Sequence, residues 1–251
     1  MNIEFVPVEL SEIAPLRDLY RHEANCQIIH YSFLARGLAD PWRIAVDGRL
    51  AGYGAIDNKY NKGCLIEFYV LPTYREIALP LCRELLLRSQ ATHIEAQTNI
   101  PLALQALNHF ATDIAAEKLL FYDALTTCLT GPSGTEFRRA LPQESQPIFA
   151  HQHEPVGDWV IEATDKIIAT GGFLTHYNPP YADLFMEVEK PARLHGYGSY
   201  LIQELKRACY EAGKKPAART DPSNIASRRT LEKAGMHPCA ELRIGKIKPQ
   251  P

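Results

Sequence analysis

Residues 187–198 read EVEKPARLHGYG, and this short stretch decides the fold of the second half of the chain. The run from Ala182 to Glu189 that leads into it is typical of a strand. From Ser199 onward, apolar residues recur at helical spacing until Gly213, which is typical of a helix C-terminus, and Lys206 falls on the polar face of this pattern. The stretch therefore predicts a strand, a glycine-containing loop and a helix, in that order.

Such a loop is suited to binding an anion. The first backbone N–H groups of a helix have no intrahelical acceptor and carry a partial positive charge, so they attract a pyrophosphate. Gly196 and Gly198 let phosphates approach the main chain closely, and Arg193 adds a charged donor. Leu201 stands where a dinucleotide fingerprint requires glycine, so that motif is disfavoured. A helix-start turn that binds nothing is the alternative.

The charge of the chain changes sign at Lys190. Residues 1–189 hold 14 basic and 24 acidic side chains, net −10, whereas residues 190–251 hold 13 basic and 5 acidic side chains, net +8. A basic segment of this kind is typical of one that meets a polyanion, either nucleic acid or a phosphorylated cofactor. A solvated basic face without a ligand is the other interpretation.

The order of predicted elements occurs twice along the chain, with a period of about 118 residues. In the first half we expect helices at 9–22, 26–34, 74–89 and 101–110 and strands at 42–46, 50–58, 64–70 and 92–97. In the second half we expect strands at 158–163, 167–174, 182–189 and 217–220 and helices at 199–212 and 225–234.

Between the halves, residues 130–135 read TGPSGT and have the chemistry of a linker. We therefore predict two domains, 1–130 and 135–251, of the α/β (α+β) class. Each is expected to be a mixed, mostly antiparallel sheet flanked by helices.

The composition indicates an ordinary globular protein, with 46% hydrophobic and 22% charged residues. The six cysteines are scattered without zinc or redox spacing and are predicted to be buried thiols. The N-terminus lacks a signal pattern, and no apolar stretch approaches the roughly 20 residues that span a bilayer. These features favour the cytoplasm, and we expect no metal site and no membrane partner.

Two motifs resemble those of the GNAT acetyltransferase superfamily. Residues 187–198 match its motif A, Arg/Gln-x-x-Gly-x-Gly/Ala after a strand. Residues 224–236, NIASRRTLEKAGM, resemble its motif B on the next strand and helix. Met236 stands where the family usually has Phe. Together the motifs cover roughly 50 residues and are jointly specific.

The resemblance implies acetyl-CoA bound in a V-shaped opening between the strand ending at Val188 and the strand 217–220. Backbone groups of Met186 and Val188 would hold the pantetheine arm, residues 195–199 the pyrophosphate, and a neighbouring helix would face the cofactor. The cofactor-binding residues implied in this way are Met186, Val188, Arg193, His195, Gly196, Tyr197, Gly198, Ser199, Asn224 and Ser227.

The resemblance also implies direct acetyl transfer to an amine. An ammonium must then lose a proton, and Glu187, on the strand beside the thioester, is the expected catalytic base. An exposed strand carboxylate without a role is the alternative. The family often uses a Tyr on the motif B helix as acid, but Leu231 stands there. Nearby candidates are Tyr177, Tyr181, Tyr197 and His176.

The first half lacks the glycine loop. Its aligned segment, residues 72–80, reads PTYREIALP, and Pro80 removes a backbone donor. We therefore expect one acetyl-CoA site per chain, in the second domain, acting on a small-molecule or peptide amine and not on nucleic acid. A catalytically silent acyl-CoA sensor or scaffold and a nucleic-acid binder are the alternative functions.

Overall fold

The computed structural model describes residues 1–27, 30–144, 146–175 and 178–249. Its contacts divide the chain into two compact units. Unit 1 is Met1–Leu119 with Ala240–Pro251, and unit 2 is Leu120–Cys239. The predicted boundaries at 130 and 135 follow chain order, whereas the contacts assign the last segment of the chain to unit 1.

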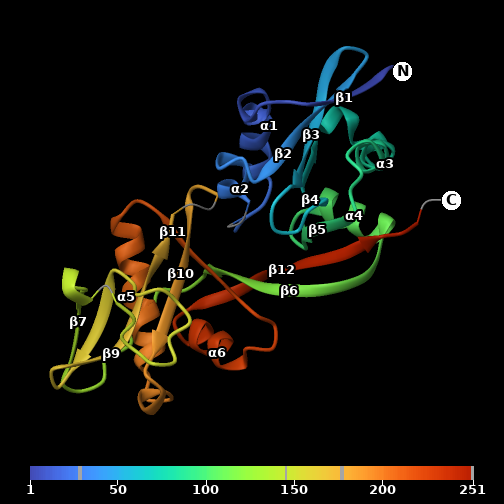
Figure 1. Cartoon of the computed structure of the whole chain (residues 1–251). Coiled ribbons are helices and arrows are strands. Elements are labelled where there is room, and N and C mark those ends of the chain that lie inside the picture. Colours follow the sequence, from blue (N-terminus) through green and yellow to red (C-terminus); the bar gives the residue numbers. More distant parts are fainter. Residues whose placement is uncertain (28–29, 145, 176–177, 250–251) are drawn as a thin grey trace. The chain divides into compact units, whose positions relative to one another are not determined.

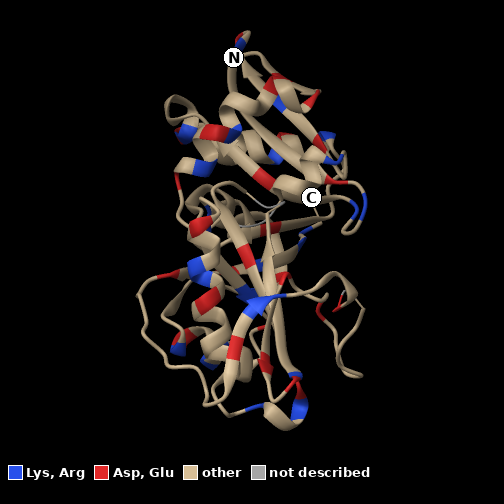
Figure 2. Cartoon of the chain, turned by 90° about the vertical axis from the view of Figure 1, so that its left-hand side faces the viewer, with Lys and Arg blue, Asp and Glu red and all other residues tan. Residues whose placement is uncertain are grey.

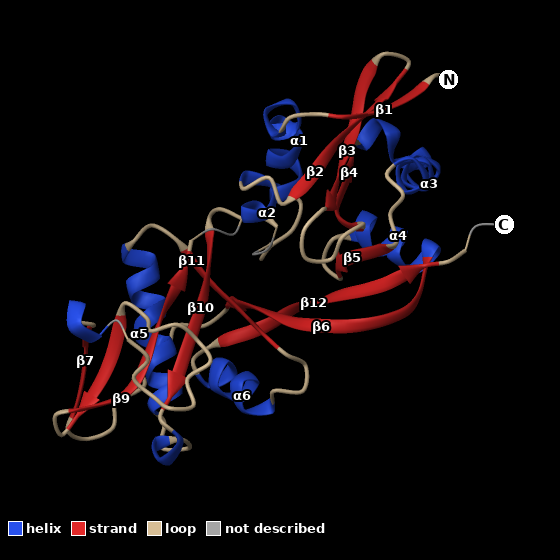
Figure 3. Cartoon of the chain, in the orientation of Figure 1, coloured by secondary structure: helices blue, strands red, loops and turns tan. Residues whose placement is uncertain are grey.

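Unit 1 is a mostly antiparallel sheet with helices packed on it (Figures 1 and 3). The strand order is β1-β2-β3-β4-β5-β12, and β4 and β5 are a parallel pair. Its elements are β1 (Ile3–Pro7), α1 (Leu10–His22), α2 (Tyr31–Ala35), β2 (Ala39–Val46), β3 (Arg49–Asp57), β4 (Cys64–Val70), the 3₁₀ turn η1 (Pro72–Ile77), α3 (Ala78–Arg88), β5 (His93–Gln97), α4 (Pro101–Phe110) and the start of β6 (Ala111–Asp123).

The helices of unit 1 form because their apolar residues recur every three or four positions. Ile13 and Leu16 bury this face of α1, and Leu81 and Leu85 bury that of α3, all at 3% exposure or less. The predicted helix at 26–34 is shorter in the structure, where α2 begins at Tyr31. Residues 28–29 of that prediction lie outside the described part of the chain.

Unit 2 repeats this plan, with strand order β6-β11-β10-β9-β8-β7. Its long helix packs on β9 and β10. The elements are β7 (Thr135–Arg139), the 3₁₀ turn η2 (Pro142–Glu144), β8 (Trp159–Ala163), β9 (Lys166–Leu174), β10 (Tyr181–Val188), the 3₁₀ turn η3 (Lys190–Ala192), α5 (Tyr197–Glu211), β11 (Lys215–Thr220), α6 (Ile225–Lys233) and the start of β12 (Met236–Ile247). The mixed, mostly antiparallel fold predicted for both halves is confirmed.

Two long strands, β6 and β12, each begin in one unit and end in the other, and neither was predicted. β12 begins in unit 2, but its later residues pair with β5 in unit 1, Leu242 opposite Gln97. β6 begins in unit 1 and ends in unit 2, where its neighbour in the sheet order is β11. Each strand finds its partner far away in the sequence, which periodicity within a short window cannot detect.

Lys206 of α5 is buried, although helical spacing had assigned it to the polar face. Its side chain is 6% exposed, and its ammonium contacts Asp123 Oδ1 at 2.6 Å, Ala234 O at 2.7 Å and Leu125 O at 2.8 Å. The three acceptors compensate the lost hydration of the charge. Lys206 therefore ties α5 to the end of β6 and the end of α6.

The cysteines are partly as predicted. Four are buried, but Cys239 is half-buried and Cys128 is exposed, so the prediction of buried thiols is wrong for these two. Cys128 lies in the polar segment between β6 and β7, which packs too little to cover it. The four buried thiols are Cys26, Cys64, Cys82 and Cys209.

Deleting residues 240–251 removes the part of β12 that pairs with β5. We expect the amides of β5 to lose protection from hydrogen exchange because their strand becomes an open edge, while those of β9 and β10 keep it. Hydrogen-exchange mass spectrometry measures both. A chain shortened only by residues 249–251 keeps β12 intact and is the control. Equal loss of amide protection in both units would contradict the assignment of residues 240–247 of β12 to unit 1.

Replacing Lys206 with Met should destabilise unit 2 by about 3–5 kcal/mol, because Asp123 is left as a mostly buried charge without its cation. The matched control is Arg207→Met, since Arg207 is 64% exposed and pairs with Glu204 on the same helix. Its effect should stay within about 0.5 kcal/mol. Urea unfolding of the two variants and the wild type checks the difference.

Candidate functional site

In unit 2, β10 and β11 diverge part of the way along their length. They pair in parallel only from Tyr181 opposite Lys215 to Asp183 opposite Ala217. Beyond that point β10 continues to Val188 and β11 to Thr220 without pairing to each other. Backbone groups beyond the pair Asp183–Ala217 therefore have no ladder partner on the neighbouring strand.

The backbone of β10 turns Met186 and Val188 toward this divergence. The N–H of Glu189 donates to Ile168 O of β9 at 2.9 Å. Because alternate residues of a strand direct their N–H and C=O groups to opposite sides, those of Val188 and Met186 point away from β9. The pantetheine contacts implied for these two residues are therefore compatible with the strand.

The two faces of β10 differ in what covers them. A Cβ added to Gly198 of α5 would lie 3.3 Å from Met186 Cε and 3.1 Å from Thr230 Cγ2. Met186 thus faces α5, and side-chain alternation puts Asp183 and Glu187 on the opposite face. Gly198 is closely packed, since a Cβ there would require the side-chain ends of Met186 and Thr230 to shift by a few tenths of an ångström.

The loop before α5 ends in a left-handed residue, Gly196, with φ 90°. Gly196 is the N-cap, and the N–H of Tyr200 donates to its carbonyl at 3.1 Å. The N–H groups of Tyr197, Gly198 and Ser199 belong to the first turn, which has no intrahelical acceptors. Because Gly196 has open space around its Cβ position, only backbone conformation requires glycine here.

Arg193 lies back on the end of β10. Its Nε donates to Val188 O at 3.3 Å and its Nη2 to Glu187 Oε1 at 3.1 Å, while about half of the side chain stays exposed. His195 Nδ1 lies 2.8 Å from Arg193 O. The structure thus brings Glu187 together with the glycine loop by an ion pair that sequence spacing did not predict.

Glu187 also contacts a histidine that the sequence analysis missed. His151 Nε2 lies 3.8 Å from Glu187 Oε1 and 3.2 Å from Val188 O, and the N–H of His153 donates to Glu187 Oε2 at 3.4 Å. His151 stacks on Phe149 with ring centroids 5.6 Å apart. It comes from an irregular, proline-containing segment, where periodicity gives no signal.

Asp183 lies at the last pair before the strands diverge and is 5% exposed. Its Oδ2 accepts from Arg219 Nε of β11 at 3.0 Å, and no described residue donates a hydrogen bond to its Oδ1. Burial raises the pKa of Asp183 to about 7, against the opposing effect of Arg219 and with a further contribution from Glu154. A carboxyl group that titrates near neutrality can accept or release a proton.

The two residues implied on α6 have local roles. Asn224 is the N-cap, and its side chain accepts from the N–H of Ser227 at 3.0 Å. Asn224 is exposed and Ser227 is half-buried, so neither is enclosed by protein. Thr230, one turn further, is the α6 residue near Gly198, which brings the start of α6 to the same end of unit 2 as the glycine loop.

No replacement for the family's tyrosine is evident among the described residues of α6. Leu231, at that position, is 4% exposed and belongs to the core, as does Met236 at 0%. Tyr181 and Tyr197 are half-buried. His176 and Tyr177, the other two candidates, lie outside the described residues.

Charge pairing explains part of the basic balance of residues 190–251. Lys and Arg are interspersed with Asp and Glu along the strands and helices (Figure 2). Three basic residues of this segment pair with acidic residues that precede Lys190 in the sequence. These pairs are Arg193–Glu187, Lys206–Asp123 and Arg219–Asp183.

Unit 1 has the same divergence, and beyond its last pair with β5 the strand β4 carries a buried side-chain network. β4 and β5 pair only at Cys64–His93 and Leu65–Ile94. Beyond them, Glu67 accepts from Arg17 at 2.6 and 2.8 Å and from the Tyr53 hydroxyl at 2.9 Å, all three being buried. Burial acts to raise the pKa of Glu67, but the Arg17 guanidinium holds it below its ordinary value.

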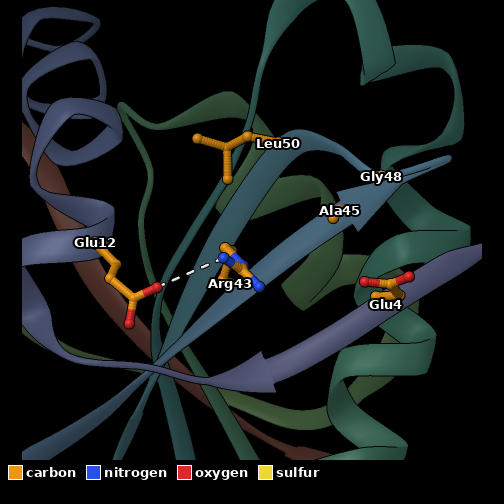
Figure 4. A pocket seen from close by; sticks show the side chains of 6 residues that line it. All are labelled: Glu4, Glu12, Arg43, Ala45, Gly48 and Leu50. Carbon is orange, nitrogen blue, oxygen red and sulfur yellow. Dashed lines mark ion pairs between the residues drawn. The ribbon is translucent and has the colours of Figure 1, made fainter.

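The segment of unit 1 that aligns with the glycine loop is the turn η1 followed by α3. Pro80 lies in the first turn of α3, where it has no N–H to offer an anion. A shallow hollow of about 340 Å³ elsewhere in unit 1 is lined by Arg43 and Glu12, 3.5 Å apart (Figure 4). It lacks a buried polar group or a helix N-terminus aimed into it.

Two further searches cover the described residues. None of the helices there is both long and apolar enough to cross a bilayer. In the same part of the chain, no three His, Cys, Asp or Glu side chains gather as metal ligands would.

Comparisons with known proteins agree on one family. The profile described as "Acetyltransferase (GNAT) family" matches residues 120–236, and the profile described as "Acetyltransferase (GNAT) domain" matches residues 9–124. A comparison with curated proteins gives no match.

Solved structures resemble the whole chain. An acetyltransferase from the GNAT family from Colwellia psychrerythraea superposes with a TM-score of 0.74 at 15% identity, over 99% of this chain and 100% of that chain. A GCN5-related N-acetyltransferase from Sphaerobacter thermophilus gives 0.61 at 18% identity, over 99% and 97%. A tandem GNAT protein from the clavulanic acid biosynthesis pathway gives 0.59 at 14% identity, over 100% of both chains. At these identities the likeness shows the fold.

Proposed function

The chain belongs to the GNAT acetyltransferase family, with two such domains in tandem, and we propose that it transfers acetyl from acetyl-CoA to an amine at one site in unit 2. Members of this family use acetyl-CoA as cosubstrate. The amine acceptor and the single site are the parts that belong to the proposal.

The observation that carries the proposal is the glycine loop at the open end of the divergence between β10 and β11. The N-terminus of α5, with Gly196 in the left-handed conformation, offers free N–H groups for a pyrophosphate. The backbone of Val188 and Met186 leads from there toward the point where the strands join. A phosphate-ended arm can therefore lie along β10 with its thioester deep in the divergence.

Binding of the coenzyme requires Arg193 to leave Val188. Arg193 and His151 both contact Val188 O, the group implied in holding pantetheine. Because about half of the Arg193 side chain is exposed, its guanidinium can turn to the pyrophosphate without losing a buried position. His195, Tyr197 and Ser199 would then line the phosphate through the first turn of α5.

Unit 1 supports the proposal of a single site. Beyond its last pair with β5, β4 carries Glu67, which is buried and paired with Arg17, and separating the two would uncover charges that now compensate each other. Its aligned segment also contributes Pro80 instead of a free N–H. We therefore assign unit 1 a structural role and no coenzyme.

The assignments of the remaining residues keep the status of proposals. Asn224 would support the cofactor side of unit 2 by capping α6, and Ser227 would face the cofactor. The role of Glu187 as catalytic base stays a prediction. In the structure its carboxylate pairs with Arg193. The alternative function, a silent acyl-CoA binder, is favoured by one observation, the core leucine at position 231 where the family often has its acid.

The loop can be tested by straining it. Gly196→Val forces a branched residue into φ 90°, at about 1–2 kcal/mol, so we expect the Kd for coenzyme A to rise about 5- to 30-fold by calorimetry. Gly213→Val is the matched control, since Gly213 at the other end of α5 has φ 70° and equally open surroundings. Equal affinity in both variants would argue against the loop. The wild type should bind one coenzyme A per chain.

Turnover separates the enzyme from the silent binder. Thiol release from acetyl-CoA is followed with lysine amide, spermidine, kanamycin and a short peptide with a free amino terminus. We expect release that depends on at least one amine, with the product's added acetyl identified by mass spectrometry. Coenzyme A binding without amine-dependent release would identify the chain as the silent binder.

A further inference from the structure

The two carboxylates on the acceptor-facing side of β10 lie at opposite ends of the divergence. Glu187 pairs with Arg193 of the glycine loop at 3.1 Å, so it stands at the phosphate end. Asp183 lies four residues before Glu187 on β10, which puts it roughly 13 Å deeper in the divergence at about 3.3 Å per residue. An arm whose pyrophosphate lies at α5 carries its thioester away from Glu187 and toward Asp183.

The surroundings of Asp183 leave one oxygen for a ligand. Arg219 of β11 holds Oδ2 at 3.0 Å, and among the described residues none donates to Oδ1. Asp183 is buried, with 5% of its surface exposed. Since a buried acceptor without a partner is unfavourable in a folded protein, Oδ1 is positioned for a donor that the described residues do not supply.

Glu187, by contrast, has its acceptor capacity in use. Its oxygens face Arg193, the ring of His151 and the N–H of His153. An incoming ammonium would have to displace these donors. The contacts suit a residue that holds the loop arginine near the phosphate end.

Resting on the function proposed above, we propose that Asp183 is the catalytic base, that its Oδ1 accepts the proton from the acceptor ammonium, and that Glu187 is a positioning residue for Arg193. The reaction then balances as follows. The ammonium gives one proton to Asp183, and the amine nitrogen forms a bond to the thioester carbonyl carbon. The carbon–sulfur bond breaks, the coenzyme thiolate takes the second proton of the nitrogen, and Asp183 returns its proton to water.

The energy of the first step fits a base of this kind. At neutral pH only roughly one in a few thousand lysine-like amines is deprotonated, from a pKa of about 10.4. Burial has raised the pKa of Asp183 to about 7, so it is a stronger base than an exposed carboxylate and still ionised in part at neutral pH.

The same charges select an ammonium as acceptor. The charged groups that affect Asp183 are Arg219 on β11 and Glu154 in the segment before β8. When Asp183 is ionised, these two carboxylates and one guanidinium leave a net negative charge, which attracts a cation and gives no advantage to a neutral hydroxyl. A primary ammonium can donate to Oδ1 and is the substrate class that this site fits.

Asp183→Asn tests the proposal through the pH dependence of kcat/KM with the best amine of the panel. In the wild type the rate should fall below about pH 7, where Asp183 becomes protonated, and level off above it. In the variant only free amine reacts, so the rate should be about 10²- to 10⁴-fold lower at pH 7 and rise tenfold per pH unit toward the amine pKa. Coenzyme A affinity should be unchanged, because Asp183 faces away from α5.

Three further variants separate the roles. Glu187→Gln should keep the levelling near pH 7 and raise KM for acetyl-CoA. Arg219→Gln keeps the carboxylate but removes the cation that lowers its pKa, so the levelling should move to higher pH even if Asp183→Asn does not fold. Asp165→Asn, in the exposed turn between β8 and β9, is the control and should match the wild type.

The outcomes are distinct. Levelling near pH 7 that survives Asp183→Asn, or disappears in Glu187→Gln instead, would overturn this inference and leave the proposed function standing. An unmoved profile in Arg219→Gln would do the same. A wild type that binds coenzyme A and acetylates no amine would overturn the proposed function, and the inference with it.

Discussion

The loss of pairing between β10 and β11 beyond Asp183 and Ala217 is the constraint on which the site in unit 2 depends. Because the two strands separate, the backbone of Met186 and Val188 is left without a ladder partner and can serve a ligand. The unpaired end of β10 leads directly into the glycine loop. The position of every candidate residue follows from where this pairing stops.

Unit 1 has the same separation and uses it differently, which shows that the fold alone does not make a site. Where unit 2 leaves the end of β10 unpaired with β11 and Asp183 Oδ1 without a donor among the described residues, unit 1 brings Arg17, Tyr53 and Glu67 into one buried network. Breaking such a network would leave an uncompensated charge, so its geometry is rigid. The difference comes from a few side chains and from one loop without glycine.

The sequence was sufficient for the features that depend on local periodicity. Most strands and helices of both units and the strand–loop–helix order around Gly196 follow from spacing and turn chemistry. Lys206 was misassigned because helical spacing does not reveal that three acceptors from distant segments meet its ammonium. His151 and the Arg193–Glu187 pair were missed because spacing along the chain does not reveal which side chains of different segments come into contact. β6 and β12 were missed because their partners are far away in the chain.

The exchange of β12 also has a consequence for synthesis on the ribosome. β5 is translated before unit 2, but β12, the strand that covers its edge, is translated after most of unit 2. Throughout the synthesis of unit 2, β5 therefore has an open edge in the nascent chain, of the kind that invites pairing with other chains. Unit 2 already has β6 to β11 when β12 emerges, so the second half of the protein can fold before the first half is complete.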